Sequence, residues 1–419
     1  MSSINNVSYI SCPRVVHLSI TKSCNWRCIF CYQSKGTLSL ENISKVIERI
    51  ADAGVKEVTL YGGEITLLKN KWIEIGEIAC QKGLIVSFIS NGELLANIDD
   101  ILLQRIQKIF YGAAFSIHGL AEVHDRIVGK SGSFNKAIET IRKFYFSGIK
   151  MAINVTVCTY NLLYIKELLR FISSRFPMVP IFINRAINHR KSSSTPPFLN
   201  KNEIVKMLKI VKSLKEEGIE LNIIGGVPIP PCILDKGLKE YAMYCSAGFD
   251  FADIDAEGNV YICPEFSDPI GNILKQELID IWNAKAMLDF RSLSWLLPKC
   301  KNCSYLDSCW GGCKADKTID YIIKENESRI YYVANPHLTV RSIDNLFAFS
   351  LPNTPVYIGN DSLRKLIGSL TEPIPAEIIK NNLGPSFDEI NKLIKRNIIL
   401  EIYRDKLKYY NPFVLKKMA

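Results

Sequence analysis

The sequence predicts an α/β fold, in which a partial (β/α)6 TIM-like barrel precedes a cysteine-rich extension and a small C-terminal winged-helix-like domain. Three observations predict this order. Apolar strand-like runs alternate with helix-length segments six times before residue 220. Seven of the 13 cysteines lie between residues 232 and 313. From about residue 330, short strand-like runs precede amphipathic segments of helix length.

The barrel prediction rests on six apolar runs and the segments between them. Continuous apolar strands that alternate with helices indicate a parallel sheet with helices on its faces, and its chemistry is expected at the C-terminal strand ends. The predicted strands are Val15–Thr21, Glu57–Tyr61, Leu84–Ser90, Ala113–Ile117, Met151–Val157 and Pro180–Arg185. The predicted helices include Glu41–Ala53, Lys71–Gln81, Ser133–Ser147, Ile165–Arg175 and Lys201–Glu217.

Two stretches rich in turn residues, Ser192–Pro197 and Gly225–Pro231, mark breaks in this alternation. We therefore expect a barrel over residues 1–225, a cysteine-rich domain over 226–325 and a third domain over 326–419. In the third domain, two short strands flank a turn at Asp344–Asn345. Three amphipathic helices and a closing hairpin are then expected at Asp361–Leu370, Pro375–Leu383, Ser386–Ile399 and Leu400–Tyr410.

Composition points to a soluble enzyme in the cytoplasm. The formal net charge is +10 over 419 residues, and its basic residues are scattered, so anionic ligands are expected rather than nucleic acid. No stretch approaches about 18 apolar residues, and the N-terminus has no pattern of a secretion signal. Because thiols stay reduced in the cytoplasm, clustered cysteines indicate metal or redox chemistry rather than disulfides.

The first cysteine group directly follows the first predicted strand. Cys24, Cys28 and Cys31 form a C-x3-C-x2-C loop, which can hold three irons of a [4Fe–4S] cluster and leave the fourth open to another ligand. A structural zinc site is the alternative, but such sites close with four ligands. The nearest candidates, Cys12 and His17, do not lie at ligand spacing.

Over about residues 15–220 the chain resembles the radical S-adenosylmethionine (SAM) superfamily. The matching motifs are CNWRCIFC with Phe30 before the last cysteine, YGGE at Tyr61–Glu64, SNG at Ser90–Gly92, FSIHG at the fourth strand end and INVTV in the fifth strand. The resemblance implies a [4Fe–4S] cluster that binds SAM and yields a 5′-deoxyadenosyl radical. It also implies an electron donor such as flavodoxin or ferredoxin.

The same resemblance implies a set of SAM contacts. The GGE turn is expected to meet the SAM amine, since its glycines allow close approach and Glu64 can accept from an ammonium. Arg126 either reaches the SAM carboxylate or serves as a helix-end or solvated residue. His118 stands where most members have Asp, and we interpret it as a tolerated polar residue rather than a proton-transfer group. The implied contacts are Gly62, Gly63, Glu64, Ser90, Asn91, Ser116, Arg126 and Asn154.

The second cysteine group resembles the SPASM extension of radical SAM enzymes, which holds auxiliary [4Fe–4S] clusters. Its pattern is Cys245, a hairpin with Gly258 before Cys263, and then C-x2-C-x5-C-x3-C from Cys300 to Cys313. Taken alone, the last four cysteines also fit a zinc knuckle. The resemblance assigns the first auxiliary cluster to Cys232, Cys245, Cys263 and Cys313.

It assigns a second auxiliary cluster to Cys300, Cys303 and Cys309, but no cysteine follows Cys313 to complete it. The fourth ligand is left open among Asp316, Asp320, His337, water and the substrate, and so is the absence of this cluster. Of the remaining residues, Cys80 and Cys158 are interpreted as core thiols. Glu265 is either a base near the substrate or a surface carboxylate.

SPASM enzymes mostly modify peptides, so the resemblance implies a peptide maturase that oxidatively crosslinks a ribosomal precursor peptide. The third domain resembles the winged-helix element that binds precursor leaders in such systems, although a plain packing domain or a DNA-binding one shares its form. Action on a sulfatase active-site residue or a tetrapyrrole is the alternative, and a non-catalytic iron–sulfur sensor is a third. The sequence names no catalytic side chain, and neither a membrane nor nucleic acid is expected as a partner.

Overall fold

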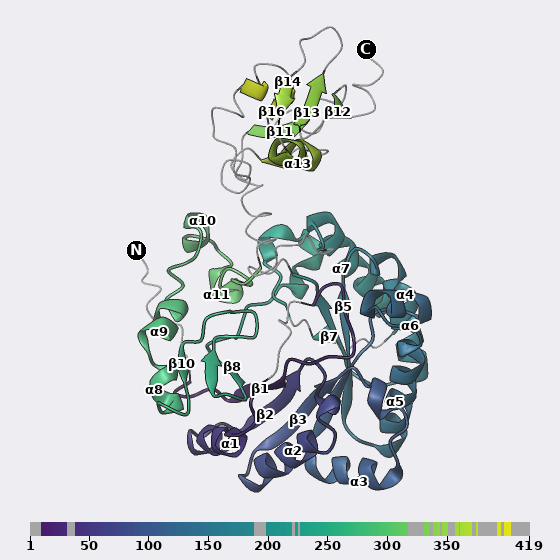
Figure 1. Cartoon of the computed structure of the whole chain (residues 1–419), viewed down its shortest axis with the longest axis vertical. Coiled ribbons are helices and arrows are strands. Elements are labelled where there is room, and N and C mark those ends of the chain that lie inside the picture. The colour runs from purple at the N-terminus through teal and green to yellow at the C-terminus, as the bar shows by residue number, and fades with distance from the viewer. Residues whose placement is uncertain are drawn as a thin grey trace. The chain divides into compact units, whose positions relative to one another are not determined.

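The computed structural model divides the chain into two compact units, Met1–Thr318 and Ile319–Ala419, which are described separately (Figure 1). Its described residues are 10–31, 38–187, 198–219, 223–224, 227–316, 330–334, 338–343, 346–350, 357–359, 361–370, 374–375, 392–394 and 398–403.

The first unit is built on one ten-stranded sheet in the order β10-β9-β8-β1-β2-β3-β4-β5-β6-β7. The strands from β8 to β7 in this order run parallel, and β8, β9 and β10 pair antiparallel with one another. The barrel strands are β1 Val15–Thr21, β2 Glu57–Gly62, β3 Ile85–Ser90, β4 Gly112–Ser116, β5 Met151–Val157, β6 Ile181–Arg185 and β7 Ile223–Ile224. The predicted α/β class is confirmed, and the six predicted strands match β1–β6 to within one residue at each end.

Helices cover the outer face of this curved sheet (Figure 1). Two of them, α3 and α4, are not among the helices that the sequence analysis named, although α3 fits the predicted alternation of strands and helices. Helix α3 begins after Asp99, whose side chain accepts from the Leu102 N–H at 2.7 Å, an N-cap that stabilises the first turn. The helices are α1 Ile43–Asp52, α2 Lys71–Gln81, α3 Asp100–Ile109, α4 Ala121–Val128, α5 Ser133–Ser147, α6 Ile165–Arg175 and α7 Lys201–Glu216.

An aromatic cluster fills part of the space between the sheet and these helices. Phe88 of β3 lies 5.0 Å from Trp72 of α2 and from Phe110, measured between ring centroids. Phe115 of β4 and Phe144 of α5 continue the cluster, with their centroids 4.9 Å apart. Truncating one such buried ring to alanine typically costs about 3–5 kcal/mol, so this cluster fixes the layers that carry the strand ends.

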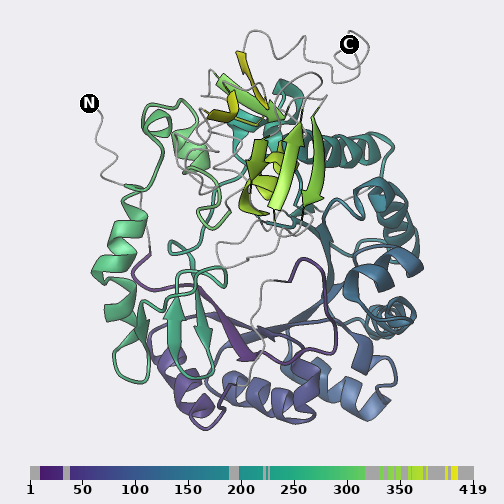
Figure 2. The same cartoon turned by 45° about the horizontal axis from the view of Figure 1, so that its top comes forward.

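The cysteine-rich region extends the barrel sheet. Strand β8 (Phe251–Asp255) pairs parallel with β1, and it turns at Gly258 into β9 (Asn259–Tyr261). Gly258 has φ +82°, which favours glycine, so the predicted hairpin forms there. Figures 1 and 2 show this hairpin beside β1. The remaining elements are β10 Gly271–Asn272, η4 Pro231–Ile233, η5 Lys236–Tyr241, α8 Leu278–Trp282, α9 Lys285–Arg291, α10 Pro298–Lys301 and α11 Leu306–Cys309.

The described part of the second unit contains two three-stranded sheets, the nine-residue helix α13 and a helical segment at residues 392–394. Strands β12 and β13 flank residues 344–345 and pair antiparallel, as expected from the sequence. Strand β16 pairs antiparallel with β11, and residues 404–410 of the predicted closing hairpin lie outside the described residues. Most residues of the predicted helices at 375–383 and 386–399 lie outside the described residues. The elements are β11 Ile330–Ala334, β12 Thr339–Ile343, β13 Leu346–Ser350, β14 Tyr357–Gly359, α13 Asp361–Ser369, β15 Ile374–Pro375 and β16 Ile399–Tyr403.

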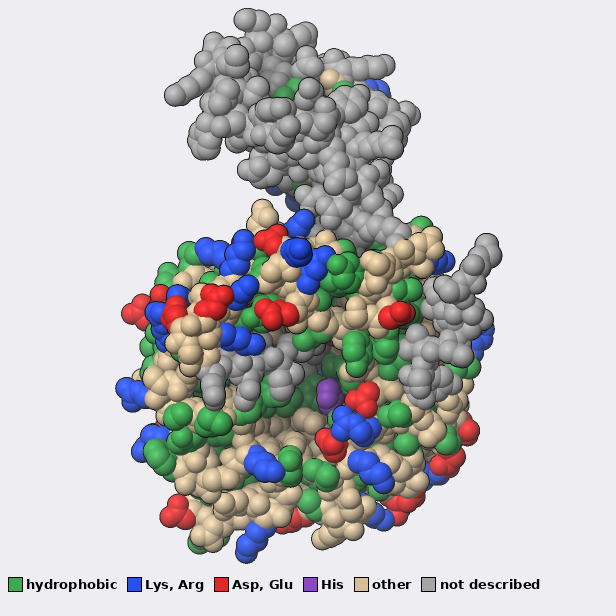
Figure 3. Space-filling view, turned by 180° about the vertical axis from the view of Figure 1, so that it is seen from behind, with side chains coloured by type: hydrophobic (Ala, Val, Ile, Leu, Met, Phe, Trp, Pro, Cys, Tyr) green, Lys and Arg blue, Asp and Glu red, His purple; other side chains and the backbone are tan. Residues whose placement is uncertain are grey.

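The described surface mixes charges of both signs. On the face shown in Figure 3, lysine and arginine side chains lie among aspartate and glutamate side chains. Among the described residues, the structure contains no helix that is both long and apolar enough to span a membrane.

Candidate active site

The YGGE turn lies against the start of the cysteine loop, where β1 and β2 end. The Gly63 N–H donates to the Thr21 carbonyl at 2.8 Å, and the Glu64 N–H donates to the Ser23 carbonyl at 2.8 Å. A Cβ on Gly63 would lie 2.3 Å from the Ser23 oxygen, and one on Gly62 would lie 2.2 Å from the Thr21 oxygen. The two glycines therefore let one strand end approach the backbone that precedes Cys24.

Glu64 is expected to accept a hydrogen bond from the SAM ammonium, and in the structure its carboxylate also joins neighbouring segments of the chain. Its side chain is buried and accepts four hydrogen bonds within the chain. Thr66 N–H donates at 3.0 Å, Thr66 Oγ1 at 2.6 Å, Ser90 Oγ at 2.8 Å and Asn91 N–H at 2.6 Å. Burial raises the pKa of Glu64, while these hydrogen bonds oppose the rise. A carboxylate has about four acceptor sites, so Glu64 here fixes the ends of β2 and β3.

The SNG segment at the end of β3 connects to the cysteine loop. Asn91 is buried, and its Nδ2 donates to Asn25 Oδ1 at 2.7 Å. Its Oδ1 accepts from the Glu93 N–H at 2.9 Å. The structure therefore brings Ser90, Asn91 and Glu64 together next to the residue that follows Cys24.

Glu93 contacts the cysteine loop and was not among the residues expected at the site. Its carboxylate is buried and accepts from Trp26 Nε1 at 2.7 Å and from Asn25 Nδ2 at 3.0 Å. Lys130 and Lys136 pair with it at 2.7 and 3.1 Å. Burial alone would raise the pKa of Glu93, but the donors Lys130, Trp26 and Lys136 lower it below its usual value. The sequence feature that could have pointed to Glu93 is its place directly after the SNG motif.

Cys24, Cys28 and Cys31 lie on a loop whose backbone is hydrogen-bonded to the end of helix α4. The Arg27 N–H donates to the Val128 carbonyl at 2.8 Å, and the Ile29 N–H donates to the Ile127 carbonyl at 3.0 Å. Cys24 and Cys31 are exposed, whereas Cys28 is partly buried. Burial raises the pKa of Cys28, and the charges of Cys31 and Cys24 raise it further, so the three thiols are electrostatic neighbours. This donor set fits a cluster with three protein thiolates.

His118 has the structural role that we favoured. It is buried, and its Nδ1 accepts from the Thr156 N–H at 3.1 Å, which places its proton on Nε2. The Phe30 ring of the cysteine loop packs edge-on against it, with centroids 4.9 Å apart. Burial lowers the pKa of His118 well below its usual value, and the charge of His124 adds to this. His118 is therefore neutral and supports the loop.

The three other residues expected to contact SAM are Ser116, Asn154 and Arg126, and they differ in position and exposure. Ser116 at the carboxyl end of β4 and Asn154 in the middle of β5 are partners in the register of the two strands, and both are partly buried. Arg126 lies on α4 and is exposed. The pairing of β4 with β5 thus brings together two of the three expected residues.

The auxiliary cysteines form two groups. We call Cys245, Cys263 and Cys313 the hairpin group. Burial raises the pKa of Cys263 well above its usual value, and the nearby charges of Cys245 and Cys313 add to the rise. The turn group comprises Cys232, Cys300, Cys303 and Cys309. Burial raises the pKa of Cys309 to about 11, and the charges of its three partners add to the rise. The charge of Cys232 thus acts on a quartet residue, and its expected place in the same cluster as Cys245 stays a prediction.

A buried ion pair stands next to the hairpin group. Arg185 at the end of β6 pairs with Asp316, and both side chains are almost fully buried. Arg185 Nη2 also donates to the Pro228 carbonyl at 3.1 Å. Burial raises the pKa of Cys313 to about 12, with contributions from Cys245 and Asp316. Asp316 therefore lies beside the hairpin group, and the other suggested ligands, Asp320 and His337, lie outside the described residues.

The described cysteines of each group lie near one another, but their thiols do not surround a common point as the ligands of one metal ion would. Over the described ranges, no three Cys, His, Asp or Glu side chains converge as the ligands of one metal ion do. The thiolates of a cubane cluster each bind a different iron, so a cluster requires neighbouring thiols rather than convergent ones. Glu265 is half-buried, and its charge acts on Cys263, which places it at the hairpin group. Cys158 is buried in the core, as expected.

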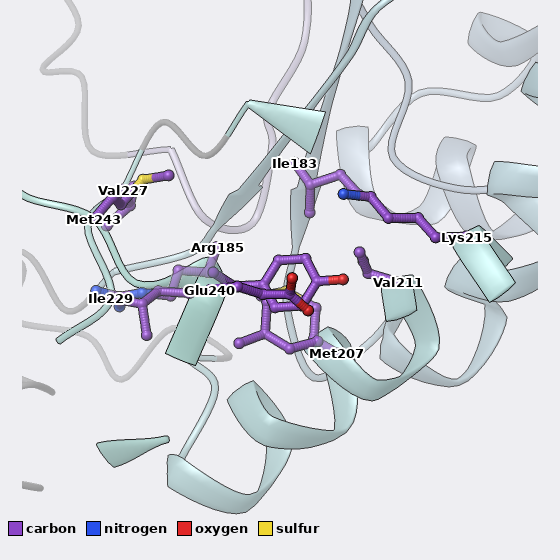
Figure 4. A pocket seen from close by; sticks show the side chains of 11 residues that line it. Ile183, Arg185, Met207, Val211, Lys215, Val227, Ile229, Glu240 and Met243 are labelled. Carbon is purple, nitrogen blue, oxygen red and sulfur yellow. The ribbon is translucent and has the colours of Figure 1, made fainter. Parts of the chain in front are cut away.

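A pocket of about 160 Å³ lies between β6, α7 and the segment that carries η5. Figure 4 shows Ile183 and Arg185 of β6 opposite Met207 and Lys215 of α7, with Glu240 of η5 between them. Arg185 therefore lines this pocket and also forms the buried ion pair with Asp316. No sequence motif marks this cavity.

Together these features define an iron–sulfur protein with an open three-thiol loop at the end of a barrel strand and further thiols on an extension of the same sheet. Residues 18–172 match the family model described as Radical SAM superfamily. Residues 245–304 match the model of SPASM, an iron–sulfur cluster-binding domain. The chain belongs to the radical SAM superfamily and carries a SPASM domain.

Several named proteins are similar to this chain. The sporulation killing factor maturation protein SkfB of Bacillus subtilis is 25% identical over 72% of this chain and 70% of its own. The AdoMet-dependent heme synthase of Oleidesulfovibrio alaskensis is 24% identical over 72% and 82%. The crystal structure of Streptococcus suis SuiB shares the fold, with a TM-score of 0.59 and 17% identity over 75% of each chain.

The superfamily membership makes this chain an enzyme and fixes its cofactors. These are a [4Fe–4S] cluster, S-adenosyl-L-methionine and auxiliary iron–sulfur clusters in the SPASM domain. Cys24, Cys28 and Cys31 fit the SAM-binding cluster, because they lie close together after the end of β1 and two of them are exposed.

Proposed function

We propose that this enzyme is a peptide maturase that oxidatively crosslinks a ribosomally synthesised precursor peptide. The observation that carries the proposal is the similarity to SkfB, a maturation protein, across 72% of this chain. The mycofactocin maturase MftC of Mycolicibacterium smegmatis adds support, with 24% identity over 74% of this chain and 80% of its own. Auxiliary thiols on the barrel sheet support an oxidation, since the electron that it releases needs an acceptor.

When bound, the clusters and SAM supply a 5′-deoxyadenosyl radical and an electron acceptor. The protein's own residues supply positioning. Glu64 joins the ends of β2 and β3, and Glu93 holds Asn25 and Trp26 of the cysteine loop. Since the loop also hydrogen-bonds to α4, its three thiols are presented on a fixed backbone.

The test is anaerobic reconstitution with SAM, a reductant and a short peptide encoded beside the gene, followed by mass spectrometry. We expect the peptide to lose two hydrogens, or about 2 Da, only when SAM and reductant are both present. The matched control is the Cys24→Ala/Cys28→Ala/Cys31→Ala variant, which should leave the peptide unchanged. Deuterium uptake from D2O without loss of mass would contradict crosslinking and indicate epimerisation.

A tetrapyrrole substrate is the second candidate, because two similar proteins are a heme synthase and the Fe-coproporphyrin III synthase of Methanosarcina barkeri, 22% identical over 74% of this chain. The same reaction should therefore be run with Fe-coproporphyrin III in place of the peptide. Peptide modification with an unchanged porphyrin supports the maturase proposal. Decarboxylation of the porphyrin with an unchanged peptide would overturn it.

A further inference from the structure

We propose that the cavity between β6, α7 and the η5 segment is a binding site for a phenol, and that Arg185 donates a hydrogen bond to the phenol oxygen. Neither the SAM-binding cluster nor an auxiliary cluster takes part in this binding. The inference goes beyond the peptide-maturase proposal and does not depend on it.

Arg185 supplies a hydrogen-bond donor to the cavity. Its side chain lines the cavity and is only 1% exposed. Nη1 donates to Asp316, and Nη2 donates to the Pro228 carbonyl at 3.1 Å. Nε is buried and has no hydrogen-bond partner among the residues that the structure describes. A buried donor without an acceptor is unfavourable, so a ligand that places an oxygen atom at Nε gains affinity.

The charges around this donor favour a neutral acceptor over an anion. Asp316 already pairs with the Arg185 guanidinium, and its side chain is fully buried. A ligand carboxylate at the same place would share one buried guanidinium with Asp316, and two buried like charges repel each other. A hydroxyl oxygen can accept from Nε without adding charge.

The walls of the cavity favour an aromatic body. Figure 4 shows two methionines, Met207 of α7 and Met243, around the cavity together with the aliphatic side chains of Ile183, Val211 and Ile229. Methionine sulfur makes favourable contacts with aromatic rings, and its unbranched side chain adapts to the shape of an occupant. The cavity holds about 160 Å³, and an aliphatic cavity of about 150 Å³ admits benzene.

Exposed side chains mark the open end of the cavity. Lys215 and Glu240 line it and are exposed, whereas Arg185 and Met207 are buried. Lys215 Nζ lies 5.2 Å from the centroid of the Tyr241 ring, which also lines the cavity. Because an ammonium over an aromatic face is favourable, the same lysine can lie over an incoming ring. The phenol therefore enters at this end and directs its oxygen to Arg185.

The test measures the binding of 4-methylphenol to the reconstituted enzyme by isothermal titration calorimetry, without SAM or peptide. Toluene is the matched ligand, because it has the same ring and lacks the oxygen. We expect 4-methylphenol to bind about tenfold more tightly than toluene or better, since only its oxygen accepts from Arg185 Nε. Equal affinities, or no binding of 4-methylphenol, would overturn the proposal.

Two variants locate the binding site. Val211→Phe fills the cavity from α7 and should weaken the binding of 4-methylphenol about tenfold or more. Ile101→Phe enlarges an exposed side chain of α3 and should change nothing. Circular dichroism checks that both variants fold, and Met243→Trp, at a half-buried position of the same cavity, replaces Val211→Phe if that variant unfolds. Unchanged affinity in the filled variant would contradict binding in this cavity.

The phenol can belong to a tyrosine of a peptide or to a free small molecule. If the tripeptide Ac-Gly-Tyr-Gly-NH2 binds as tightly as 4-methylphenol, the site takes a tyrosine side chain. If only 4-methylphenol binds, the site takes free phenols, because a peptide backbone then does not pass Lys215 and Glu240. Both results support a phenol site. Since no reaction is measured, failure of the peptide-maturase proposal leaves these results unaffected.

Discussion

The two cysteine regions of this enzyme are built in opposite ways. The loop from Cys24 to Cys31 draws three thiols from eight consecutive residues and leaves two of them exposed. The auxiliary region draws its thiols from separate segments and buries Cys263 and Cys309. An exposed loop suits a cluster that must receive a cosubstrate, and an enclosed one suits a cluster that only passes electrons.

The supports of the two regions differ as well. The cysteine loop is held by hydrogen bonds from three strand ends and one helix, with Glu64 and Glu93 as the central acceptors. The auxiliary region is held by aromatic contacts around Trp310 and by the buried Arg185–Asp316 pair. Hydrogen bonds thus position the first region, whereas aromatic packing and one buried ion pair hold the second.

Removing the exposed thiols should give the largest effect on activity. The Cys24→Ala/Cys28→Ala/Cys31→Ala variant is expected to lose 5′-deoxyadenosine formation by about 100-fold or more, because no cluster remains to bind SAM. Chromatography of the quenched reaction measures the product, and iron analysis should show that the auxiliary clusters remain. Undiminished 5′-deoxyadenosine would contradict the assignment of this loop.

Breaking the buried pair should give the largest effect on stability. Asp316→Asn leaves the Arg185 guanidinium buried without its counter-ion, and such a change costs about 3–5 kcal/mol. Denaturant unfolding of the reconstituted enzyme measures the loss. The double variant Arg185→Met/Asp316→Leu should recover most of it, because no charge is then buried, and equal loss in both variants would contradict this account.

A region could be predicted from the sequence when its contacts lie within a short stretch of the chain, and could not when they join distant segments. The cysteine loop and the hairpin around Gly258 were predicted because short stretches of sequence specify them. The strands of the barrel were predicted for the same reason. Helix α4 was not, since it begins at Ala121 with no side-chain cap and is only eight residues long.

Contacts between distant segments could not be derived from one sequence. The partners of Glu64, Ser90 and Asn91, come from the end of another strand, so the sequence around Glu64 could not predict these hydrogen bonds. The contact between Lys239 and Tyr305 likewise joins two segments that are 66 residues apart in the sequence, and no local pattern predicts it.

A smaller effect is expected where the glycine turn meets the cysteine loop. Gly63→Ala places a methyl group 2.3 Å from the Ser23 carbonyl oxygen, so the backbone before Cys24 must move. We expect a loss of about 1–3 kcal/mol in stability, together with slower 5′-deoxyadenosine formation. The matched control is Gly368→Ala, since a Cβ there meets no atom within 4 Å. Equal effects of the two changes would contradict the steric argument.

The smallest of these effects concerns Glu93 and depends on pH. Because the donors around it lower its pKa in the folded state, ionised Glu93 stabilises the fold above its unfolded pKa, and this contribution is lost as the pH falls through the folded value. Glu93→Gln should therefore cost about 1–2 kcal/mol at neutral pH and progressively less below about pH 4.5. Unfolding by denaturant at several pH values measures the difference. Glu48→Gln, which removes an exposed partner of Lys82, should show no measurable cost at any pH, because solvent screens that pair. A Glu93→Gln cost that stayed constant in acid would mean that shape, and not charge, holds Trp26 and the cysteine loop in place.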